Sequence, residues 1–432
     1  MSSIRCLVVA DDLTGGGDTG AQFAAKGLRT LLATLGVSRR APLDDKRWPV
    51  LVLNTHSRAL APRQAYQRVA DLLTQLDLSR FEVIYKKIDS TLRGNIGSEI
   101  DALLEASPRA VGFLTPAFPA MGRTVENGIL KVRGVPVAET EIFRDPVCPV
   151  TESHVVTLLQ RQTIHRVGLV DLPLLRRGAA ALREAVARRI DAGEKLLVFD
   201  CLERRDLAVI AELGVMLQPT PLFIGSAGLA EALATHVSAR RSGRLAARPS
   251  VTPATHVVVV CGSASEVSRR QLAKLGQNLD LACVEIQPAI AYRRSAPARA
   301  ARRTVTRTVA EALDAGSVIL SVSRERMRGA NLDERAVAQA VADALGRITT
   351  KAVSLSAIAP AEVAFVLTGG DTAMAVLQAL GTEGVEIGSE PVEGIMAGRL
   401  RGGLCSDAQI ITKAGAFGGD DALLRVMRML KG

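Results

Sequence analysis

The segment VVADDLTGGGDTG, residues 8–20, joins a short β-branched run to a glycine-rich turn. Similar turns follow other apolar runs, in VLNTHSR (52–58), YKKIDSTLRGN (85–95), FLTPAFPAMGRT (113–124), FIGSAG (223–228), VVCGSAS (259–265), VLTGGDTA (366–373) and ITKAGAFGG (411–419). Runs of this kind alternate with amphipathic stretches such as 62–76, which is typical of α/β domains with largely parallel sheets. Ligands bind at the carboxyl ends of such strands, so the turns predict two ligand half-sites, one in each domain, that face each other.

The chain has 432 residues, which exceeds the roughly 250 to 300 residues at which a single core stops growing. After Ser238 it is rich in Arg, Ser, Gly and Pro as far as Thr255. We therefore expect an N-terminal domain over 1–240, a linker at about 241–254 and a C-terminal domain over 255–432. The predicted fold is two α/β domains with largely parallel sheets and the active site in the cleft between them.

Strand candidates come from the β-branched runs. They are 4–10, 50–54, 83–87, 110–114, 166–170, 196–199 and 222–224 in the first half, and 256–260, 281–286, 318–322, 363–367 and 409–412 in the second. No run reaches the roughly 18 apolar residues of a membrane helix, and the run before Asp11 is too short for a secretory signal. We therefore expect a cytoplasmic protein with no membrane partner. The six cysteines are scattered, without CxxC pairs, and predict reduced thiols.

The formal net charge of +10 is concentrated in two arginine-rich segments. They contain Arg240, Arg241, Arg244 and Arg248, and Arg293, Arg294, Arg299, Arg302 and Arg303. The first resembles a linker and the second precedes an amphipathic helix, so we interpret both as solvated surface and expect no nucleic-acid partner. An aromatic content of 3% also argues against recognition of stacked bases.

Carboxylates dominate the first glycine-rich turn. The glycines of 15–20 formally satisfy GxGxxG, the dinucleotide-binding pattern, but Asp11, Asp12 and Asp18 would repel a pyrophosphate there. Three carboxylates at a strand end suit the binding of sugar hydroxyls, the removal of a proton from one of them, or help in coordinating Mg²⁺. For Asp18, capping of the next helix is an alternative role.

Cations and hydroxyls are concentrated in KKIDSTLRGN, residues 86–95. The arginine fork binds carboxylate or phosphate, lysine adds a point charge, and the aspartate and hydroxyls can satisfy alcohols. Arg58, which follows another strand candidate, adds a cation at the same edge. Together these residues predict a site for a small hydroxylated acid, the alternative being surface salt bridges.

The second half contains strand, small-residue turn and helix start in VVCGSAS and VLTGGDTA. Glycines let backbone N–H groups approach phosphate oxygens, and a helix N-terminus favours their negative charge. This predicts a nucleotide-phosphate site, in which Asp371 either caps the helix or meets phosphate through Mg²⁺. The sequence contains no GxxxxGK[ST], GxSxG or HExxH. ITKAGAFGG supplies a third turn that could lie along a nucleotide.

In combination, ADDLTGGGDTG, YKKIDSTLRGNIGSEI, PAFPAMGRTVENGIL followed by GVPV, FIGSAGLA, VVCGSAS, LTGGDTA and ITKAGAFGG resemble the four-carbon acid sugar kinase family from near residue 10 to near residue 420. The resemblance implies an N-terminal domain that binds the acid sugar and a C-terminal domain that binds ATP, with Mg²⁺ assisting transfer to the terminal hydroxyl. The chain departs from the family pattern at Gly16 and Gly17, where Ala-Asn is expected, and in the looser EPVEGIMAG.

The resemblance also implies roles for individual residues. The expected substrate-binding residues are Asp18, Arg58, Lys87, Asp89, Ser90, Thr91 and Arg93. The expected ATP-binding residues are Ser263, Gly369, Gly370, Asp371, Thr372 and Gly415. Either Asp12 or Asp18 would orient or deprotonate the attacking hydroxyl, and the metal ligands are left unassigned.

The predicted activity is ATP-dependent phosphorylation of the 4-hydroxyl of D-threonate to give 4-phospho-D-threonate. D-erythronate 4-kinase and 3-oxo-tetronate 4-kinase activities are alternatives within the same family. Two alternatives of other classes are an NAD-dependent hydroxy-acid dehydrogenase and a non-catalytic metabolite-sensing protein, but neither explains both halves of the chain. The expected partners are a sugar acid and ATP, and a homodimer is left open.

Overall fold

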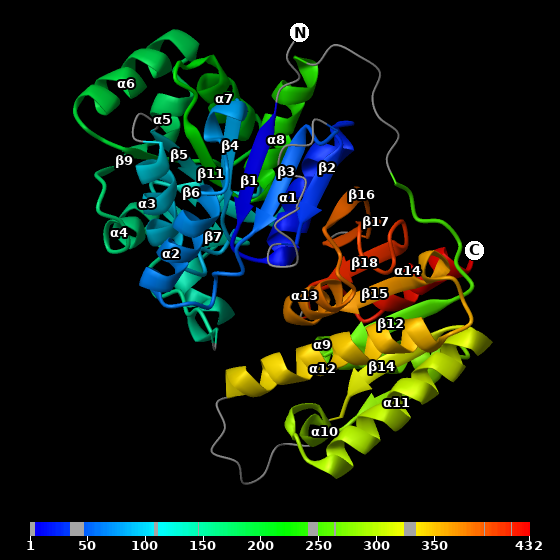
Figure 1. Cartoon of the computed structure of the whole chain (residues 1–432). Helices are drawn as coiled ribbons and strands as arrows, with labels where there is room; N and C mark the ends of the chain where they lie inside the picture. Colours follow the sequence, from blue (N-terminus) through cyan, green and yellow to red (C-terminus); the bar gives the residue numbers. More distant parts are fainter. Residues whose placement is uncertain are drawn as a thin grey trace. The chain divides into compact units, whose positions relative to one another are not determined.

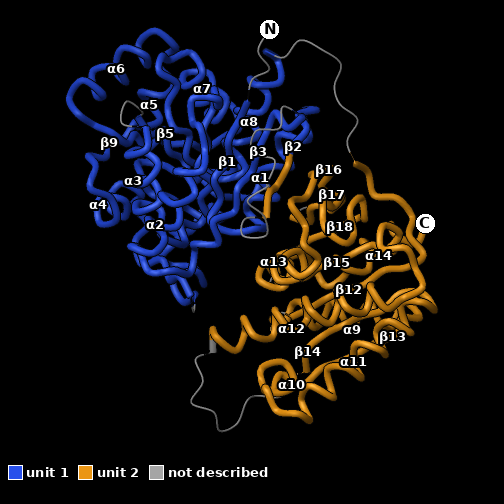
Figure 2. Tube along the Cα trace, viewed as in Figure 1, with its two compact units in different colours: residues 1–30, 43–246 blue, residues 31–42, 247–432 orange. Residues whose placement is uncertain are grey.

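The chain forms two compact units in the computed structural model, which describes residues 5–34, 47–107, 111–145, 147–240, 249–262, 265–323, 334–392, 394–415 and 417–432. Unit 1 comprises residues 1–30 and 43–246, and unit 2 comprises residues 31–42 and 247–432 (Figure 2). Each unit is an α/β structure with a mostly parallel sheet (Figure 1), so the predicted fold class is confirmed. Unit 1 differs from the predicted domain 1–240 in that segment 31–42 groups with unit 2.

In the described part of unit 1, the main sheet has seven parallel strands in the order β3-β1-β4-β11-β5-β10-β9. Its strands are β1 (Cys6–Ala10), β3 (Val50–Asn54), β4 (Val83–Lys87), β5 (Gly112–Thr115), β9 (Val167–Val170), β10 (Leu196–Phe199) and β11 (Leu222–Gly225). Ala10 pairs with Asn54 on one side and with Lys87 on the other, so β3, β1 and β4 end at the same level. The chain moves from β1 to β3 and then to the opposite side of β1, and such a reversal is where ligands bind in open α/β sheets.

Helices and a small second sheet complete unit 1. The helices are α1 (Leu13–Ala25), α2 (Pro62–Leu73), α3 (Ile96–Ala106), α4 (Val155–Gln160), α5 (Leu172–Leu175), α6 (Ala179–Asp191), α7 (Arg204–Met216) and α8 (Ala227–Ala239), with 3-10 turns η1 (Leu78–Arg80), η2 (Pro119–Met121), η3 (Val137–Glu139) and η4 (Glu141–Arg144). The antiparallel strands β6 (Arg123–Glu126), β7 (Ile129–Val132) and β8 (Val135–Pro136) form the second sheet, which follows β5 in the chain. Asp12 caps α1, and proline occupies the first turn of α2, where its missing N–H costs nothing.

The sheet of unit 2 contains parallel strands in the order β13-β14-β12-β15-β18, followed by antiparallel β17 and β16. Its strands are β12 (Val257–Cys261), β13 (Ala282–Ile286), β14 (Val318–Val322), β15 (Ala364–Thr368), β16 (Gly384–Val392), β17 (Ile395–Arg401) and β18 (Gln409–Lys413). Residues 31–33 of β2 (Thr30–Ala33) also belong to this unit, and β2 lies next to β16 in the sheet order. Its helices are α9 (Glu266–Asn278), α10 (Pro288–Tyr292), α11 (Ala296–Ala315), α12 (Glu334–Leu355), α13 (Gly370–Ala379) and α14 (Ala422–Lys431), with the 3-10 turn η5 (Pro360–Glu362).

The described residues bear on the expectations for the cysteines, for membrane helices and for the arginine-rich segments. All six cysteines are free thiols. Within the described ranges, no helix is both long and apolar enough to span a membrane. In the arginine-rich segments, Arg240, Arg293 and Arg294 are exposed, whereas residues 241–248 lie outside the described residues. The absence of a nucleic-acid partner stays a prediction.

Candidate functional site

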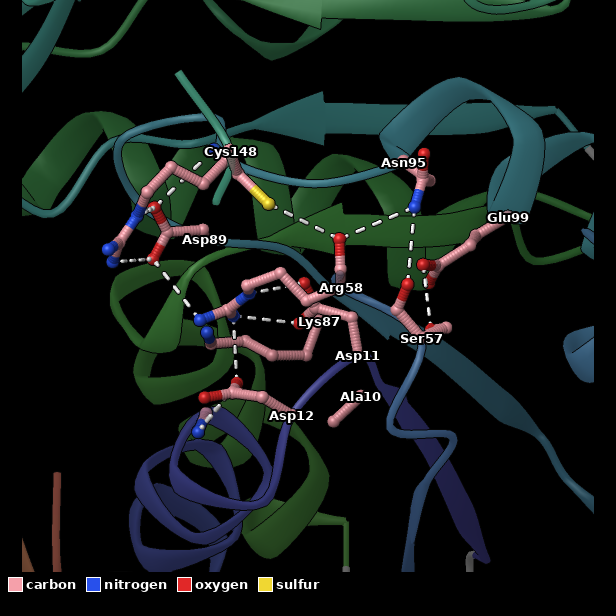
Figure 3. A network of polar contacts seen from close by, with 12 residues as sticks. Ala10, Asp11, Asp12, Ser57, Arg58, Lys87, Asp89, Asn95, Glu99 and Cys148 are labelled. Atoms are coloured by element: carbon pink, nitrogen blue, oxygen red, sulfur yellow. Dashed lines mark hydrogen bonds and ion pairs between the residues drawn. The ribbon is translucent and has the colours of Figure 1, made fainter. Parts of the chain in front are cut away.

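Charged side chains converge where β1, β3 and β4 end. Asp11 and Asp12 follow β1, Arg58 lies in the loop after β3, and Lys87 is the last residue of β4. Figure 3 shows these side chains pointing toward one another, with Asp89 of the loop after β4 beside them. Because the three strands are parallel and end at one level, residues distant in the sequence meet at one edge of the sheet.

Arg58 lies among three carboxylates. Its Nε donates to Asp11 Oδ2 at 2.7 Å, and its Nη2 donates to Asp11 Oδ1 at 2.9 Å and to Asp12 Oδ1 at 2.8 Å. Its Nη1 lies 4.0 Å from Asp89 Oδ1. Burial acts to raise the pKa of Asp11, but the charges of Arg58 and Lys86 outweigh it, and the pKa lies below its ordinary value. Arg58 is therefore committed to holding protein carboxylates in place.

Arg93 forms a second fixed pair. Its Nε and Nη2 donate to the two oxygens of Asp89 at 2.8 and 3.0 Å, a bidentate arrangement, and its Nη1 donates to Asp145 Oδ2 at 3.2 Å. Asp89 also accepts a hydrogen bond from the Thr91 hydroxyl. Burial would raise the pKa of Asp89, but the charges of Arg58 and Arg93 hold it well below the ordinary range. Asp89 is consequently ionised throughout the physiological range.

The N-terminus of α1 adjoins this cluster. Asp12 caps the helix, its Oδ1 accepting from the Gly15 N–H at 3.0 Å. A Cβ at position 15 would lie 2.5 Å from Asp12 Oδ1 and 2.8 Å from Lys87 Nζ, distances that real Cβ atoms do not adopt. A side chain at position 15 would therefore displace Asp12 Oδ1 and Lys87 Nζ from the N-terminus of α1.

A buried polar network supports the loop that carries Arg58. Lys86 Nζ lies 2.6 Å from Glu99 Oε2, and the Ser57 hydroxyl donates to Glu99 Oε1 at 2.8 Å. Burial raises the pKa of Glu99 even though Lys86 opposes the shift. Asn95 Nδ2 donates to the carbonyls of Ser57 and Arg58 at 3.2 and 3.4 Å. The Arg58 backbone is therefore anchored from two directions.

In unit 2, three glycine-rich turns begin along one edge of the sheet. Cys261 at the end of β12 pairs with Thr368 at the end of β15, and Thr368 pairs with Lys413 at the end of β18. The Gly369 N–H donates to the Lys413 carbonyl at 2.9 Å. The turns after these strands therefore start side by side, as expected of a site for an extended ligand such as a nucleotide.

Side chains from within unit 2 hold the turn after β18. Lys413 Nζ donates to three carbonyls of the turn 414–417, at 2.6, 3.1 and 3.1 Å. The hydroxyls of Ser265 and Ser268, in the first turn of α9, both donate to the Gly415 carbonyl. Burial lowers the pKa of Lys413 to about 8. Side chains thus hold the carbonyls of Ala414, Gly415 and Phe417, the described residues of this turn.

The turn after β15 leads directly into α13. Gly369, the N-cap, has φ of 97°, a left-handed conformation that favours glycine, and Asp371 is exposed in the first turn. A Cβ on Gly262, after β12, would lie 2.5 Å from Thr372 Oγ1. The hydroxyl of Thr368 is buried without a hydrogen-bond partner in the described part of the chain. Small residues thus let the β12 turn approach the N-terminus of α13.

The structure brings most of the sequence-predicted residues together, although their roles stay predictions. Asp12, Arg58, Lys87, Asp89 and Arg93 gather at the edge of unit 1. Thr91 and Ser90 lie in the same loop, Thr91 bonded to Asp89 and Ser90 half-buried. Asp18 lies further along α1. Burial is the main cause that raises the pKa of Tyr85, and the charge of Asp18 raises it further. In unit 2, Gly369, Gly370, Asp371, Thr372 and Gly415 lie in the adjoining turns, and Ser263 lies outside the described residues.

Other residues of the two clusters were given no individual role from the sequence. Asp11 was grouped with Asp12 and Asp18 as a strand-end carboxylate suited to sugar hydroxyls, but it was not singled out as a site residue. Asp145 comes from the segment after η4, 52 positions from its partner Arg93, and no local motif marks it. Lys413 lies within ITKAGAFGG, where an isolated lysine gives no sign of its backbone contacts.

Two family models match the chain. One describes a sugar-binding N-terminal domain and matches residues 6–233, and the other describes a nucleotide-binding C-terminal domain and matches residues 258–423. The chain is 36% identical to the D-threonate kinase of Salmonella typhimurium, over 97% of each protein. It is 33% identical to the D-erythronate kinase of Heliobacterium modesticaldum, over 96% of this chain and 94% of that protein.

A solved structure of a Salmonella typhimurium LT2 protein has the same fold, with a TM-score of 0.76, 25% identity, and coverage of 98% of this chain and 99% of that one. The two relatives match the chain through both units, and both are named as kinases. The protein is accordingly a carbohydrate-acid kinase that uses ATP. With both domain models matched and full-length relatives above 30% identity, the chain belongs to the four-carbon acid sugar kinase family.

Proposed function

We propose that this protein transfers the γ-phosphoryl group of ATP to the 4-hydroxyl of D-threonate. The observation that carries the proposal is the 36% identity, over nearly the full chain, to a D-threonate kinase. A second D-threonate kinase, from Bordetella bronchiseptica, is 35% identical. D-erythronate is the second candidate, because a D-erythronate kinase follows at 33% identity. A 3-oxo-tetronate kinase is less similar, at 32%.

The charged cluster of unit 1 supports a hydroxylated acid as the substrate. We assign substrate binding to Asp18, Arg58, Lys87, Asp89, Ser90, Thr91 and Arg93. Arg58 and Arg93 hold Asp12 and Asp89 in fixed orientations, so that carboxylate oxygens can accept hydrogen bonds from the substrate hydroxyls. Because these acceptor side chains are already oriented, fewer groups of the protein must become ordered when the substrate binds.

Asp12 is the carboxylate that we assign to the attacking 4-hydroxyl, with Asp18 as the alternative. Oδ1 of Asp12 is occupied by the Gly15 N–H and by Arg58 Nη2. In the described part of the chain no hydrogen bond reaches its Oδ2, and the side chain is 26% exposed. Phosphoryl transfer depends mainly on alignment and charge stabilisation, so a fixed acceptor is more important than a strong base.

The turns of unit 2 support the nucleotide. We assign ATP contacts to Ser263, Gly369, Gly370, Asp371, Thr372 and Gly415, because backbone N–H groups at the N-terminus of α13 suit phosphate oxygens. The described residues include no cluster of three His, Cys, Asp or Glu that could hold a metal. Mg²⁺ is normally held by one or two carboxylates together with nucleotide phosphates, and Asp371 supplies one such carboxylate. When bound, Mg²⁺ would neutralise charge on the phosphates.

The test is ADP release with Mg·ATP and a panel of D- and L-threonate, D- and L-erythronate and 3-oxo-tetronate. We expect the highest kcat/KM for D-threonate, and a loss of about 100-fold or more in kcat for Asp12→Asn with KM for ATP unchanged. The exposed cap Asp77 provides a matched control, since Asp77→Asn should retain full activity. A preference for D-erythronate would establish the second candidate, and no turnover of any acid would refute the proposal.

A further inference from the structure

The motif PAFPAMGRT, which the roles proposed above leave unused, leads from β5 into β6 at Arg123. β5 is two strands from β4 in the sheet, and the Ser226 hydroxyl after β11 donates to the Ala117 carbonyl at 2.8 Å. The chain after the β6–β8 sheet returns Asp145 to Arg93. The segment that leads to Arg123 therefore leaves the main sheet at the carboxyl end of β5, on the edge that carries the substrate-site cluster.

The two arginines already described at this edge are paired with carboxylates of the protein itself. Arg58 donates to Asp11 and Asp12, and Arg93 donates to Asp89 and Asp145. Each of these ion pairs lies within hydrogen-bonding distance, so neither guanidinium can turn to a new carboxylate without leaving a partner unpaired. A substrate carboxylate requires a cation that the protein has not already neutralised.

Arg123 meets that requirement. Among the described residues it makes one hydrogen bond, from Nη1 to the Met121 carbonyl, and no ion pair. Its Nε is buried without a hydrogen-bond partner, a state that is costly in a folded protein unless a ligand or water relieves it. Burial lowers the pKa of Arg123, and although Asp89 opposes this, the charges of Arg133 and Arg93 lower it further. Glu141 opposes the shift as well, but neither Glu141 nor Asp89 forms an ion pair with Arg123 in the described part of the chain.

The hairpin holds the two arginines rigidly. Backbone hydrogen bonds between Arg123 and Phe118 run in both directions, at 2.9 and 3.1 Å. The Arg133 N–H donates to the Gly122 carbonyl at 2.6 Å, and Arg133 itself has φ of 50°, a left-handed conformation that is uncommon outside glycine. A Cβ at position 122 would lie 3.1 Å from Arg133 Cγ. Gly122 therefore lets Arg133 pack beside the start of β6.

We propose that Arg123 binds the carboxylate of the sugar acid, with Arg133 strengthening the local positive potential, an inference that rests on the proposed function of the same site. The guanidinium fork matches a carboxylate and is always charged, which suits it to this role. Lys87, by contrast, lies beside the N-terminus of α1 and Asp12, the carboxylate that we assign to the attacking hydroxyl. Arg123 is then the residue that selects an acid over a neutral sugar.

The test compares D-threonate with its neutral amide, D-threonamide, as substrates of the full-length protein. For Arg123→Gln we expect kcat/KM for D-threonate to fall roughly 10- to 100-fold, the usual range for losing a charged hydrogen bond, with kcat/KM for D-threonamide changing less than about twofold. Arg123→Lys should recover part of the loss on the acid. Calorimetric titration with D-threonate should show the same loss of affinity without turnover.

Lys131 of the same hairpin supplies the matched control, because it is a cation already paired with Glu126 at 2.7 Å. Lys131→Gln should keep the wild-type preference for the acid, and both variants should keep the wild-type KM for ATP and melting temperature. An unchanged acid preference in Arg123→Gln would overturn the inference. If the wild type phosphorylates D-erythronate instead, the proposed substrate is wrong, whereas D-erythronate against its amide still tests Arg123.

Discussion

The candidate sites of the two units are built from different materials. In unit 1 the site consists of charged side chains, with Arg58 and Arg93 each locked between carboxylates. In unit 2 it consists of glycine-rich turns, and the carbonyls of the turn after β18 accept hydrogen bonds from Lys413 and from serine hydroxyls at the start of α9. A sugar acid differs from related sugars in the positions of a few polar groups, so its recognition requires side chains at defined positions. Phosphates, by contrast, can be bound by backbone N–H groups.

The largest expected effect is that of Arg58→Met on unit 1. The change leaves Asp11, whose side chain is 5% exposed, without its partner, and also releases Asp12. Removing one member of a buried pair typically lowers the free energy of unfolding by about 3–5 kcal/mol. We also expect kcat/KM for the sugar acid to fall about 100-fold or more, because Asp12 loses its orientation. Urea unfolding and steady-state kinetics measure the two effects.

Arg188 is the control for this variant, because it forms an exposed pair with Glu184 on α6. Exposed pairs contribute little, so Arg188→Met should leave stability and kinetics essentially unchanged. If Arg58→Met were as mild as Arg188→Met, the ion-pair cluster would not be the framework of the unit 1 site.

A smaller, paired effect is expected from two glycine substitutions. Gly15→Ala places a Cβ against Asp12 and Lys87, and Gly262→Ala places one against Thr372. We expect Gly15→Ala to raise KM for the sugar acid about tenfold, and Gly262→Ala to raise KM for ATP to a similar extent, each with less than about a twofold change for the other substrate. Initial rates with one substrate varied at a time measure both constants.

Gly276 in α9 has more space, its nearest Cβ neighbour being Cys283 Sγ at 3.9 Å. Gly276→Ala should leave both KM values unchanged and stabilise the protein by up to about 1 kcal/mol, because alanine favours the helix. If Gly15→Ala and Gly262→Ala altered the same KM, the division of labour between the two sites would be wrong.

The smallest expected effect is the contribution of Lys413 in unit 2 to the pH dependence of stability. The pKa of Lys413 is lowered to about 8 by burial, so between about pH 8 and 10.5 the unfolded chain binds this proton and the folded protein does not. Stability should therefore rise with pH in that window, by at most about 1.4 kcal/mol per pH unit from this group. Urea midpoints for the wild type and Lys413→Met at pH 7.5, 8.5 and 9.5 measure the contribution. Parallel curves would show that Lys413 does not titrate there.

Periodicity of apolar residues predicted most of the parallel strands. The predicted bounds of β3, β4, β10 and β14 match the structure. The strands β2, β6–β8, β16 and β17 were not predicted. β16 has the sequence GVEIGSEPV, in which glycines and a proline interrupt the β-branched pattern, so tertiary pairing rather than local preference makes it a strand. The grouping of 31–33 with unit 2 has no local signal either, since it depends on a distant partner.

The sequence predicted those residues of the site that lie at the end of a predicted strand or just after it. Arg58 and Asp89 follow strands, Lys87 ends one, and the parallel sheet brings strand ends together. What the sequence could not supply is the pairing. Nothing local shows that Arg93 reaches Asp145, or that Arg58 is already saturated by carboxylates while Arg123 is not. Those facts depend on side-chain positions that only the folded chain defines.

The membership of residues 31–33 in unit 2 has a consequence for modularity. With compact units of 1–30 plus 43–246 and 31–42 plus 247–432, the chain passes from one unit to the other at three points. If the gene were cut at the linker, β2 would be separated from β16. The edge of β16 would then be unpaired, and unpaired strand edges are a known cause of aggregation. Fusions or truncations of this protein should therefore preserve both segments of each unit.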